Sequence, residues 1–168
     1  MPQFYRFSHP ISNQYPTMIE LFTRKLDAIQ LPEDTVITPL PIDEDISSLS
    51  AILLDDDYYE FLKQGKVIVN GVTVLHAAYL IPFKAKAWLD LREKKDVDSS
   101  DIKKHRNDII RIVSDMVLQK CILPDEVRKD MEKFIEQFDV TESELKNLKI
   151  RGTKPEDIKR VLQTTYLD

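Results

Sequence analysis

The residue of this sequence whose position most suggests chemistry is Lys84. On a helix with about 100° per residue, Leu80, Ala87 and Leu91 fall on one apolar stripe and Lys84 lies in its middle, whereas Lys86 points to the opposite face. A lysine among apolar side chains is unfavourable unless its ammonium reaches an anion or water. The first functional question is therefore which anion Lys84 binds.

A histidine and two aspartates in the next helical segment are the candidate neighbours of Lys84. The apolar stripe of that segment is formed by Ile102, Ile109, Val113 and Met116. His105 lies inside this stripe, and Asp101 and Asp108 lie along its margin. Consecutive helices joined by a short connection pack as an antiparallel pair. We therefore expect these side chains to meet Lys84 between the helices or in a cleft beside them.

Two interpretations of this cluster follow from the residue types. In the first, Lys84 forms a structural ion pair with Asp101 or Asp108, and His105 is a hydrogen-bonded core histidine. In the second, Lys84 is a cationic spot that binds phosphate groups, for which a lysine is suited as a mobile point charge. Charged pairs between helices are more often structural, which favours the first interpretation, but the sequence leaves both open.

Other acidic residues are candidates for metal binding. Residues 16–24 alternate with the period of a strand, which places Glu20 between Met18 and Phe22 on one face. Because acids are rarely buried without a partner, Glu20 is either paired or at a sheet edge where it reaches solvent. Three consecutive aspartates at 55–57 open a helical segment. They favour the positive end of the helix dipole, and no further ligand is spaced for a metal, so we predict a capping role.

Composition and charge exclude several classes of function. The chain has 168 residues and a net charge of -5, which argues against binding duplex DNA through bulk positive charge but leaves room for a local basic cleft. No apolar run reaches the length of a membrane span, no signal peptide is evident, and Cys121 stands alone. We therefore expect a cytoplasmic protein without disulfides. The three glycines are too dispersed for a Walker loop or a dinucleotide-binding turn.

Strand patterns fill the first part of the chain. Four segments have strand character: residues 2–8, 16–24, 35–41 and 48–54. A short helix over residues 55–63 follows, and then the run VIVNGVTV, in which Asn70 and Gly71 are the pair that a type I′ hairpin turn requires. Residues 1–75 are thus predicted to form a small mixed sheet with a β-hairpin.

From residue 76 onward the pattern is helical. Long helices are predicted over residues 78–94 and 101–118, and Pro82 is tolerated only if it lies in the first turn. A third helix begins at Pro124, with an apolar face of Val127, Met131, Phe134, Ile135 and Phe138. Capping boxes at Thr141 with Glu144, and at Thr153 with Glu156, open helices over residues 141–148 and 154–165. The chain is therefore an α+β protein: a sheet lobe of residues 1–75, then a helical bundle of residues 76–168.

Residues 2–118 resemble the C-terminal half of the AbiEii-like nucleotidyltransferases, which share a catalytic palm with DNA polymerase beta. The phrase AYLIPFKAKAWLDLREKK places Lys84 where the family has a lysine in a pattern like AxxKxxAL. The phrase DSSDIKKHRNDIIRI is similar to its acidic segment, although Asp101 and Asp108 are seven residues apart and the family's pair is closer. FYRFSHPISNQYPTMIELF resembles its late palm strand and places Glu20 at a metal-binding acid.

This resemblance implies roles for each of these residues. Glu20, Lys84, Asp101 and Asp108 would be catalytic, Lys84 and His105 would contact the nucleotide, and Glu20 would bind metal. The cofactors implied are Mg²⁺ and a nucleoside triphosphate.

The sequence also departs from this family. Nucleotide transfer needs a Gly-Ser turn for the phosphates and two acids one residue apart that hold two Mg²⁺ ions. Asp43 and Asp45 have this spacing, but they follow the strand of Glu20 in a Pro-rich stretch without a Gly-Ser turn, and we interpret them as coincidental. We predict a nucleotidyltransferase-like fragment or reduced relative, inactive as this chain alone, that retains nucleotide or phosphate binding at Lys84.

The alternative hypothesis is a non-enzymatic interaction module, such as a toxin–antitoxin or defence-system component. It would dock a protein partner or a second copy of itself through the apolar face of the C-terminal helices.

Overall fold

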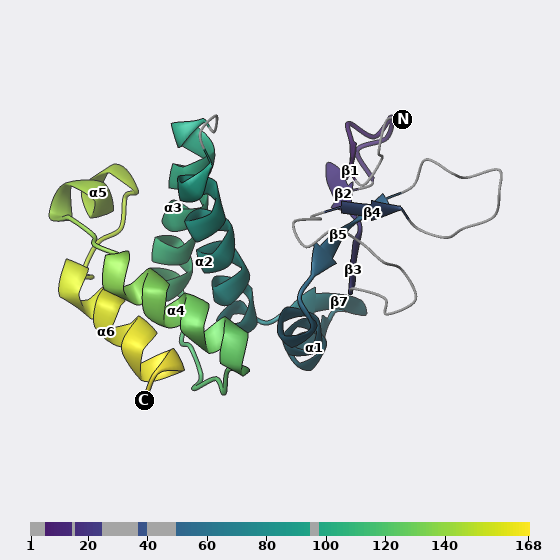
Figure 1. Cartoon of the computed structure of the whole chain (residues 1–168). Helices are drawn as coiled ribbons and strands as arrows, with labels where there is room; N and C mark the ends of the chain where they lie inside the picture. The colour runs from purple at the N-terminus through teal and green to yellow at the C-terminus, as the bar shows by residue number, and fades with distance from the viewer. Residues whose placement is uncertain (1–5, 15, 25–36, 40–49, 95–97) are drawn as a thin grey trace. The chain divides into compact units, whose positions relative to one another are not determined.

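The computed structural model describes residues 6–14, 16–24, 37–39, 50–94 and 98–168. They divide into two compact units, Met1–Tyr59 and Glu60–Asp168, which we describe separately. Strands are the main secondary structure among the described residues of the first unit, and helices are that of the second (Figure 1). The predicted α+β class, with a small N-terminal set of strands and a C-terminal helical bundle, is confirmed.

The described residues of the first unit form two small sheets. Strands β1 (Arg6–Ser8) and β2 (Met18–Glu20) pair antiparallel. In the second sheet, β5 (Ser50–Leu54) lies between β3 (Phe22–Arg24), to which it is parallel, and β4 (Ile37–Pro39), to which it is antiparallel.

The single strand expected over residues 16–24 is wrong, because it breaks at Leu21 into β2 and β3, which belong to different sheets. The expected apolar neighbours of Glu20 do not form a buried face. Met18 and Phe22 are 44% and 48% exposed. Asp43 and Asp45 lie outside the described residues.

A helix and a hairpin lead into the bundle. Helix α1 (Asp56–Gln64) begins with Asp56 and Asp57 in its first turn, and Asp55 Oδ1 accepts a hydrogen bond of 2.9 Å from the Asp57 N–H, as expected of a cap. Strands β6 (Lys66–Val69) and β7 (Val72–Leu75) form the predicted hairpin. Asn70 and Gly71 have φ values of 50° and 78°, and both signs are those of a type I′ turn.

The hairpin belongs with the helices and not with the sheets of the first unit. The N–H of His76 donates to the carbonyl of Gly65 at 2.9 Å. The ring of Phe61 packs on those of Tyr79 and Phe83, with centroid distances of 4.7 and 6.3 Å. For this reason the compact units divide at residue 59, whereas the sequence suggested a boundary at residue 75.

Five helices complete the described part of the second unit. They are α2 (Ala77–Glu93), α3 (Ser99–Asp115), α4 (Asp125–Gln137), α5 (Glu142–Asn147) and α6 (Pro155–Tyr166). Helices α2 and α3 lie side by side, α4 packs on α2, and α6 packs on α3 and α4 (Figure 1). No helix in the described part of the chain is both long and apolar enough to cross a membrane.

The predicted apolar face of α4 lies in the core of this bundle. Val127, Met131 and Phe134 are completely buried, and Phe138 is 1% exposed. Trp88 of α2 meets Phe134 edge-on at a centroid distance of 5.3 Å. Other residues of the same chain therefore cover this face. The alternative hypothesis needed it exposed for docking, and that expectation is wrong.

The two predicted capping boxes have different outcomes. The box at Thr141 and Glu144 is confirmed, because Thr141 Oγ1 accepts from the Glu144 N–H and Glu144 Oε2 accepts from the Thr141 N–H. The second box is wrong, because the N-cap is Lys154 and not Thr153, and its side chain does not cap the helix. Helix α6 begins at Pro155, so the third helical position is Asp157, whose carboxylate accepts from the Lys154 N–H at 3.1 Å.

Pro82 lies further into its helix than expected. It is the sixth residue of α2 and is buried, so its missing N–H removes the hydrogen bond that would normally reach the carbonyl of Ala78. That carbonyl accepts a hydrogen bond of 2.6 Å from the Tyr166 hydroxyl instead. The last helix of the chain thus supplies the donor that Pro82 lacks, and burial raises the pKa of Tyr166, which keeps the hydroxyl protonated.

This arrangement predicts coupling between Tyr166 and Pro82. In Tyr166→Phe, the carbonyl of Ala78 is left buried without its donor, which should lower the free energy of unfolding by about 1–3 kcal/mol. In a Pro82→Ala background the backbone N–H of residue 82 restores a donor, so the same substitution should lower it by less. Urea denaturation of the four proteins in a double-mutant cycle measures the difference. Equal losses in both backgrounds would contradict the exchange of donors.

Candidate functional site

Lys84 lies at the edge of the core and not in the middle of an apolar face. The buried side chains of α2 are those of Ala77, Ala78, Ile81, Pro82, Ala85, Trp88 and Leu89. The expected stripe of Leu80, Ala87 and Leu91 is only half-buried, because α2 turns its other side toward α3 and α4. The Lys84 side chain is 20% exposed as a result.

The anion next to Lys84 is Asp108. Its Oδ2 lies 2.7 Å from Lys84 Nζ, which joins α2 to α3. Its Oδ1 lies 3.8 Å from a terminal guanidinium nitrogen of Arg111, one turn further along α3. Of the two aspartates proposed from the sequence, Asp108 is therefore the partner, whereas Asp101 is exposed in the first turn of α3.

His105 lies on α3 within the influence of this pair. Its Nδ1 atom is buried and has no hydrogen-bond partner among the residues that the structure describes, so the expected hydrogen-bonded core histidine is wrong for this nitrogen. Burial lowers the pKa of His105, and the positive charges of Lys84 and Lys104 lower it further, while Asp108 and Asp101 oppose them. The imidazole is consequently neutral at pH 7.

Glu20 belongs to the first unit, whereas the Lys84 cluster belongs to the second. It ends β2, where its backbone pairs with that of Arg6, and it is half-buried. Among the described residues, no group of three or more His, Cys, Asp or Glu side chains could hold a metal ion. Glu20 therefore has no such group around it in the described part of the chain.

The strongest interaction that the sequence did not indicate joins α3 to α5. Arg106 donates to both oxygens of Glu144, at 2.5 and 3.0 Å, and to the carbonyl of Asp139. Its guanidinium also lies over the ring of Phe138. This fork, together with the hydrogen bonds from Thr141, lowers the pKa of Glu144 to about 2. The only sequence signal was the capping box, which pointed to Thr141 but not to Arg106.

Cys121 is not a candidate nucleophile. Its side chain is buried, and burial raises the pKa of the thiol, with a partly opposing effect from a hydrogen bond with Tyr79. Because the thiolate is the reactive form of cysteine, Cys121 has a packing role.

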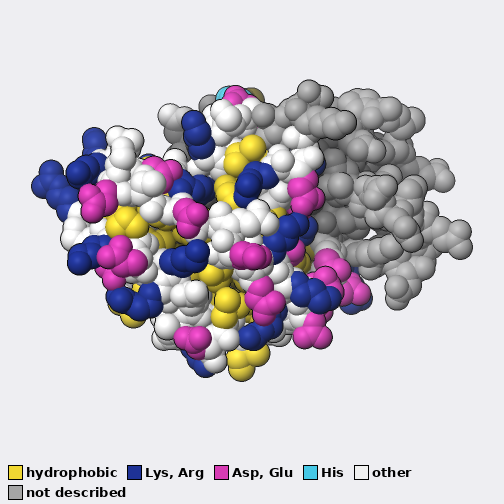
Figure 2. Space-filling model, turned by 60° about the vertical axis from the view of Figure 1, so that its left-hand side comes forward, with side chains coloured by type: hydrophobic (Ala, Val, Ile, Leu, Met, Phe, Trp, Pro, Cys, Tyr) yellow, Lys and Arg dark blue, Asp and Glu magenta, His cyan; other side chains and the backbone are white. Residues whose placement is uncertain are grey.

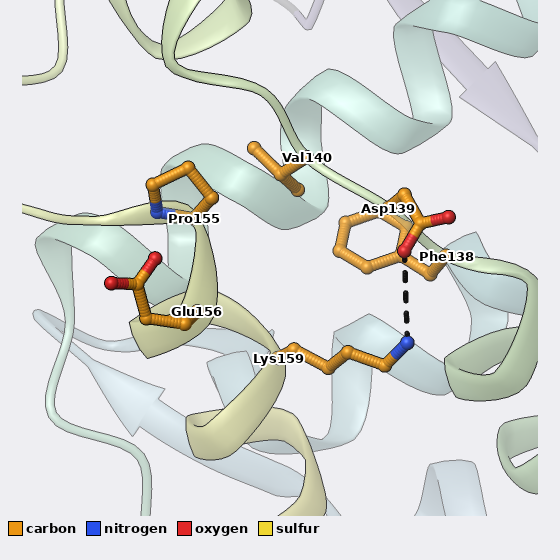
Figure 3. Close-up of a pocket in the computed structure, with 6 residues that line it drawn as sticks. All are labelled: Phe138, Asp139, Val140, Pro155, Glu156 and Lys159. Atoms are coloured by element: carbon orange, nitrogen blue, oxygen red, sulfur yellow. Dashed lines mark ion pairs between the residues drawn. The ribbon is translucent and has the colours of Figure 1, made fainter.

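A hollow of about 260 Å³ lies where α6 begins (Figure 3). It is lined by Phe138, Asp139, Val140, Pro155, Glu156 and Lys159. The ammonium of Lys159 turns toward Asp139, 3.7 Å away, while Glu156 lies on the opposite side (Figure 3). With one cation and two carboxylates, this hollow does not favour an anion.

No protein-family model matches this sequence, and no significant match was found among curated proteins or solved structures. The resemblance to the AbiEii-like nucleotidyltransferases therefore stays a prediction from the residues, and the function is argued from the geometry alone.

The Arg106 fork predicts a specific dependence of stability on pH. The pKa of Glu144 is lower in the folded protein than the ordinary 4.5, so the folded state binds fewer protons than the unfolded chain between pH 4.5 and about 2. The ionised Glu144 carboxylate therefore stabilises the folded protein fully above pH 4.5. This stabilisation is lost as the pH falls from 4.5 to about 2.

Glu144→Gln should lower the free energy of unfolding at pH 7 by about 1 kcal/mol, through the lost ion pair with Arg106, because the glutamine oxygen can still accept from the Thr141 N–H. It should also flatten the decline in stability between pH 4.5 and 2. Urea denaturation across this range measures both effects, with Glu142→Gln as the control because Glu142 is exposed in the same helical turn. An undiminished decline in Glu144→Gln would contradict the assignment.

Proposed function

We propose that the edge of the α2–α3 pair around Lys84 binds the phosphate groups of a nucleotide, and that this chain binds nucleotides without transferring them. The observation that carries the proposal is the charge balance at this edge. One carboxylate, Asp108, faces both the ammonium of Lys84 and the guanidinium of Arg111, so the three groups together have an excess positive charge.

The exposure of these groups supports an exchange of partners. The side chains of Lys84 and Asp108 are 20% and 28% exposed, and that of Arg111 is 53% exposed. A phosphate oxygen can therefore approach Lys84 and take the place of Asp108 while Arg111 provides a second contact. Bonds from Lys84 and Arg111 to phosphate would be charge-assisted, as the bond from Lys84 to Asp108 already is, so the exchange keeps a charged partner on each cation.

The buried Nδ1 of His105 is the second supporting feature. Buried polar atoms without a partner are uncommon in folded proteins, and this one lies on the same helix as Asp108, one turn earlier. A small rotation of the imidazole, once Asp108 is released from Lys84, would let His105 bond to a phosphate or ribose oxygen. Asp101, exposed at the start of α3, would help to orient the histidine.

The residues of this edge do not fit a magnesium ion. Mg²⁺ prefers several oxygen ligands, and the Lys84 edge offers one carboxylate that is already paired with cations. Any Mg²⁺ would therefore enter together with the triphosphate. The proposed roles are recognition of phosphate by Lys84 and Arg111, and charge balance by Asp108, with Glu20 left outside this cluster. Cytoplasmic location stays a prediction from the sequence.

Lys86 provides a matched control on the same helix. Its ammonium is paired with Asp90 at 2.6 Å and lies 4.0 Å from Asp130, away from Asp108. Lys84→Ala and Lys86→Ala remove the same charge from α2, but only the first removes it from the proposed site.

Three variants test the site in opposite directions. Lys84→Ala should weaken ATP binding at least about tenfold, the loss of one charge-assisted hydrogen bond, whereas Lys86→Ala should leave it unchanged. Asp108→Asn should strengthen it, because Lys84 and Arg111 lose their competing carboxylate. The measurements are isothermal titration of ATP and the shift in melting temperature that it causes, each with Mg²⁺ and with EDTA.

An absence of ATP binding by the intact chain would reject the proposal. Equal weakening in Lys84→Ala and Lys86→Ala would also reject it. In either case the Lys84–Asp108 pair would be structural, as the first interpretation of the sequence holds.

A further inference from the structure

A second surface, independent of Lys84, is formed by the segment that joins α5 to α6. Between residues 145 and 155 the sequence has four cations, Lys146, Lys149, Arg151 and Lys154, and no acidic residue. All four side chains are exposed. In a chain with a net charge of -5, this is a local concentration of positive charge against the overall balance.

The unpaired state of these cations distinguishes them from most others in the helical unit. Elsewhere an acid is commonly within reach: Lys86 pairs with Asp90, Lys129 with Glu126 and Lys133 with Glu93. Cationic and anionic side chains are accordingly interspersed over much of the face shown in Figure 2. None of these four cations, of which Lys146 lies in the last turn of α5, has an ion pair with any described residue, so their field is not neutralised locally.

The backbone holds this segment in a defined shape. Helix α5 ends with two hydrogen bonds typical of a Schellman motif, from the Lys149 N–H to the Lys146 carbonyl at 3.0 Å and from the Ile150 N–H to the Leu145 carbonyl at 2.9 Å. Lys149 has φ of 61°, in the left-handed region that favours glycine. A lysine occupies a position that glycine would occupy with less strain, which points to a use for its charge.

Three of the four cations line an open hollow. Its volume is about 600 Å³, and Lys146, Lys149, Ile150 and Arg151 line it. Both flanks are anchored in the core, by Leu145 on one side and Ile158 on the other. The cations therefore belong to a loop whose two ends are held by buried residues.

We propose that this segment, the α5–α6 basic loop of Lys146, Lys149, Arg151 and Lys154, binds the phosphate backbone of a nucleic acid. Several cations around an open hollow suit a polymer with repeating phosphates better than a single phosphate group. Binding of this kind depends on the charges and not on base sequence. A membrane surface is a poorer fit, because the one large apolar residue at the hollow, Ile150, is half-buried and offers little to insert.

The test is a titration of the full chain into a fluorescein-labelled 20-base-pair DNA duplex, followed by anisotropy at increasing salt. Matching single-stranded DNA and RNA probes determine which nucleic acid is preferred. With up to four phosphate contacts, the slope of log K against log salt for the duplex should approach about -3 to -4. Replacement of all four loop cations by glutamine should weaken binding at least tenfold and bring this slope close to zero.

A matched variant removes the same amount of charge elsewhere. Lys63, Lys129 and Lys133 are exposed, Lys86 is half-buried, and all four are paired with acids. Their replacement by glutamine should leave binding within about twofold. Lys149→Gly provides a second check, because it relieves the left-handed backbone. It should raise the melting temperature and still weaken nucleic-acid binding severalfold.

Three results would overturn the proposal. One is an absence of binding at 50 mM salt, and another is an equal loss of binding in the two quadruple variants. The third is binding to phosphatidylserine vesicles without binding to any nucleic-acid probe, which would assign the loop to a membrane. Nucleotide binding at Lys84 is measured separately, so failure of either site leaves the other result unaffected.

Discussion

The hydrogen bond from the Tyr166 hydroxyl to the carbonyl of Ala78 is the interaction on which the helical unit depends most clearly. Pro82 lies inside α2 and cannot donate to that carbonyl. The last turn of α6 must therefore reach the first turn of α2, across 88 residues of sequence. The backbone of Cys121, which donates to the carbonyl of Thr165 at 2.9 Å, adds a second link to the same turn of α6. The first bond joins the two ends of the bundle's chain, and the second joins its last helix to the segment between α3 and α4.

The position of this tie determines which side of α2 becomes core. With Ala78, Pro82 and Ala85 turned inward, Trp88 reaches Phe134 on α4, and Lys84 is left at the margin beside α3. Lys84 is thus partly exposed. Because water also reaches its ammonium, one carboxylate is enough as a partner. An edge of this kind can exchange its partner for a ligand, whereas a completely buried ion pair would be strongly opposed by the desolvation of its charges.

The two proposed binding surfaces use charge in different ways. At Lys84, two cations share one carboxylate, and the site is suited to a small anion that displaces an existing partner. At the α5–α6 basic loop no carboxylate is present, and the site is suited to a polyanion. The Arg106 fork on Glu144 joins α5 to α3, so the loop belongs to the same compact unit as Lys84.

The sequence by itself determined the local structure. It indicated the α+β class, the type I′ turn at Asn70 and Gly71, the cap at Thr141 and Glu144, and the apolar face of α4, because these depend on residues close together in the chain. It also indicated that Lys84 needs an anion from the next helix. Only the tertiary structure decided the rest: that Asp108 and not Asp101 is this anion, that residues 16–24 divide between two sheets, and that Pro82 lies beyond the first turn of its helix. The physical reason is that each of these features depends on a partner distant in sequence, such as Tyr166 for Ala78. Periodicity shows which side chains share a face of a helix, but it does not show which face packs inward.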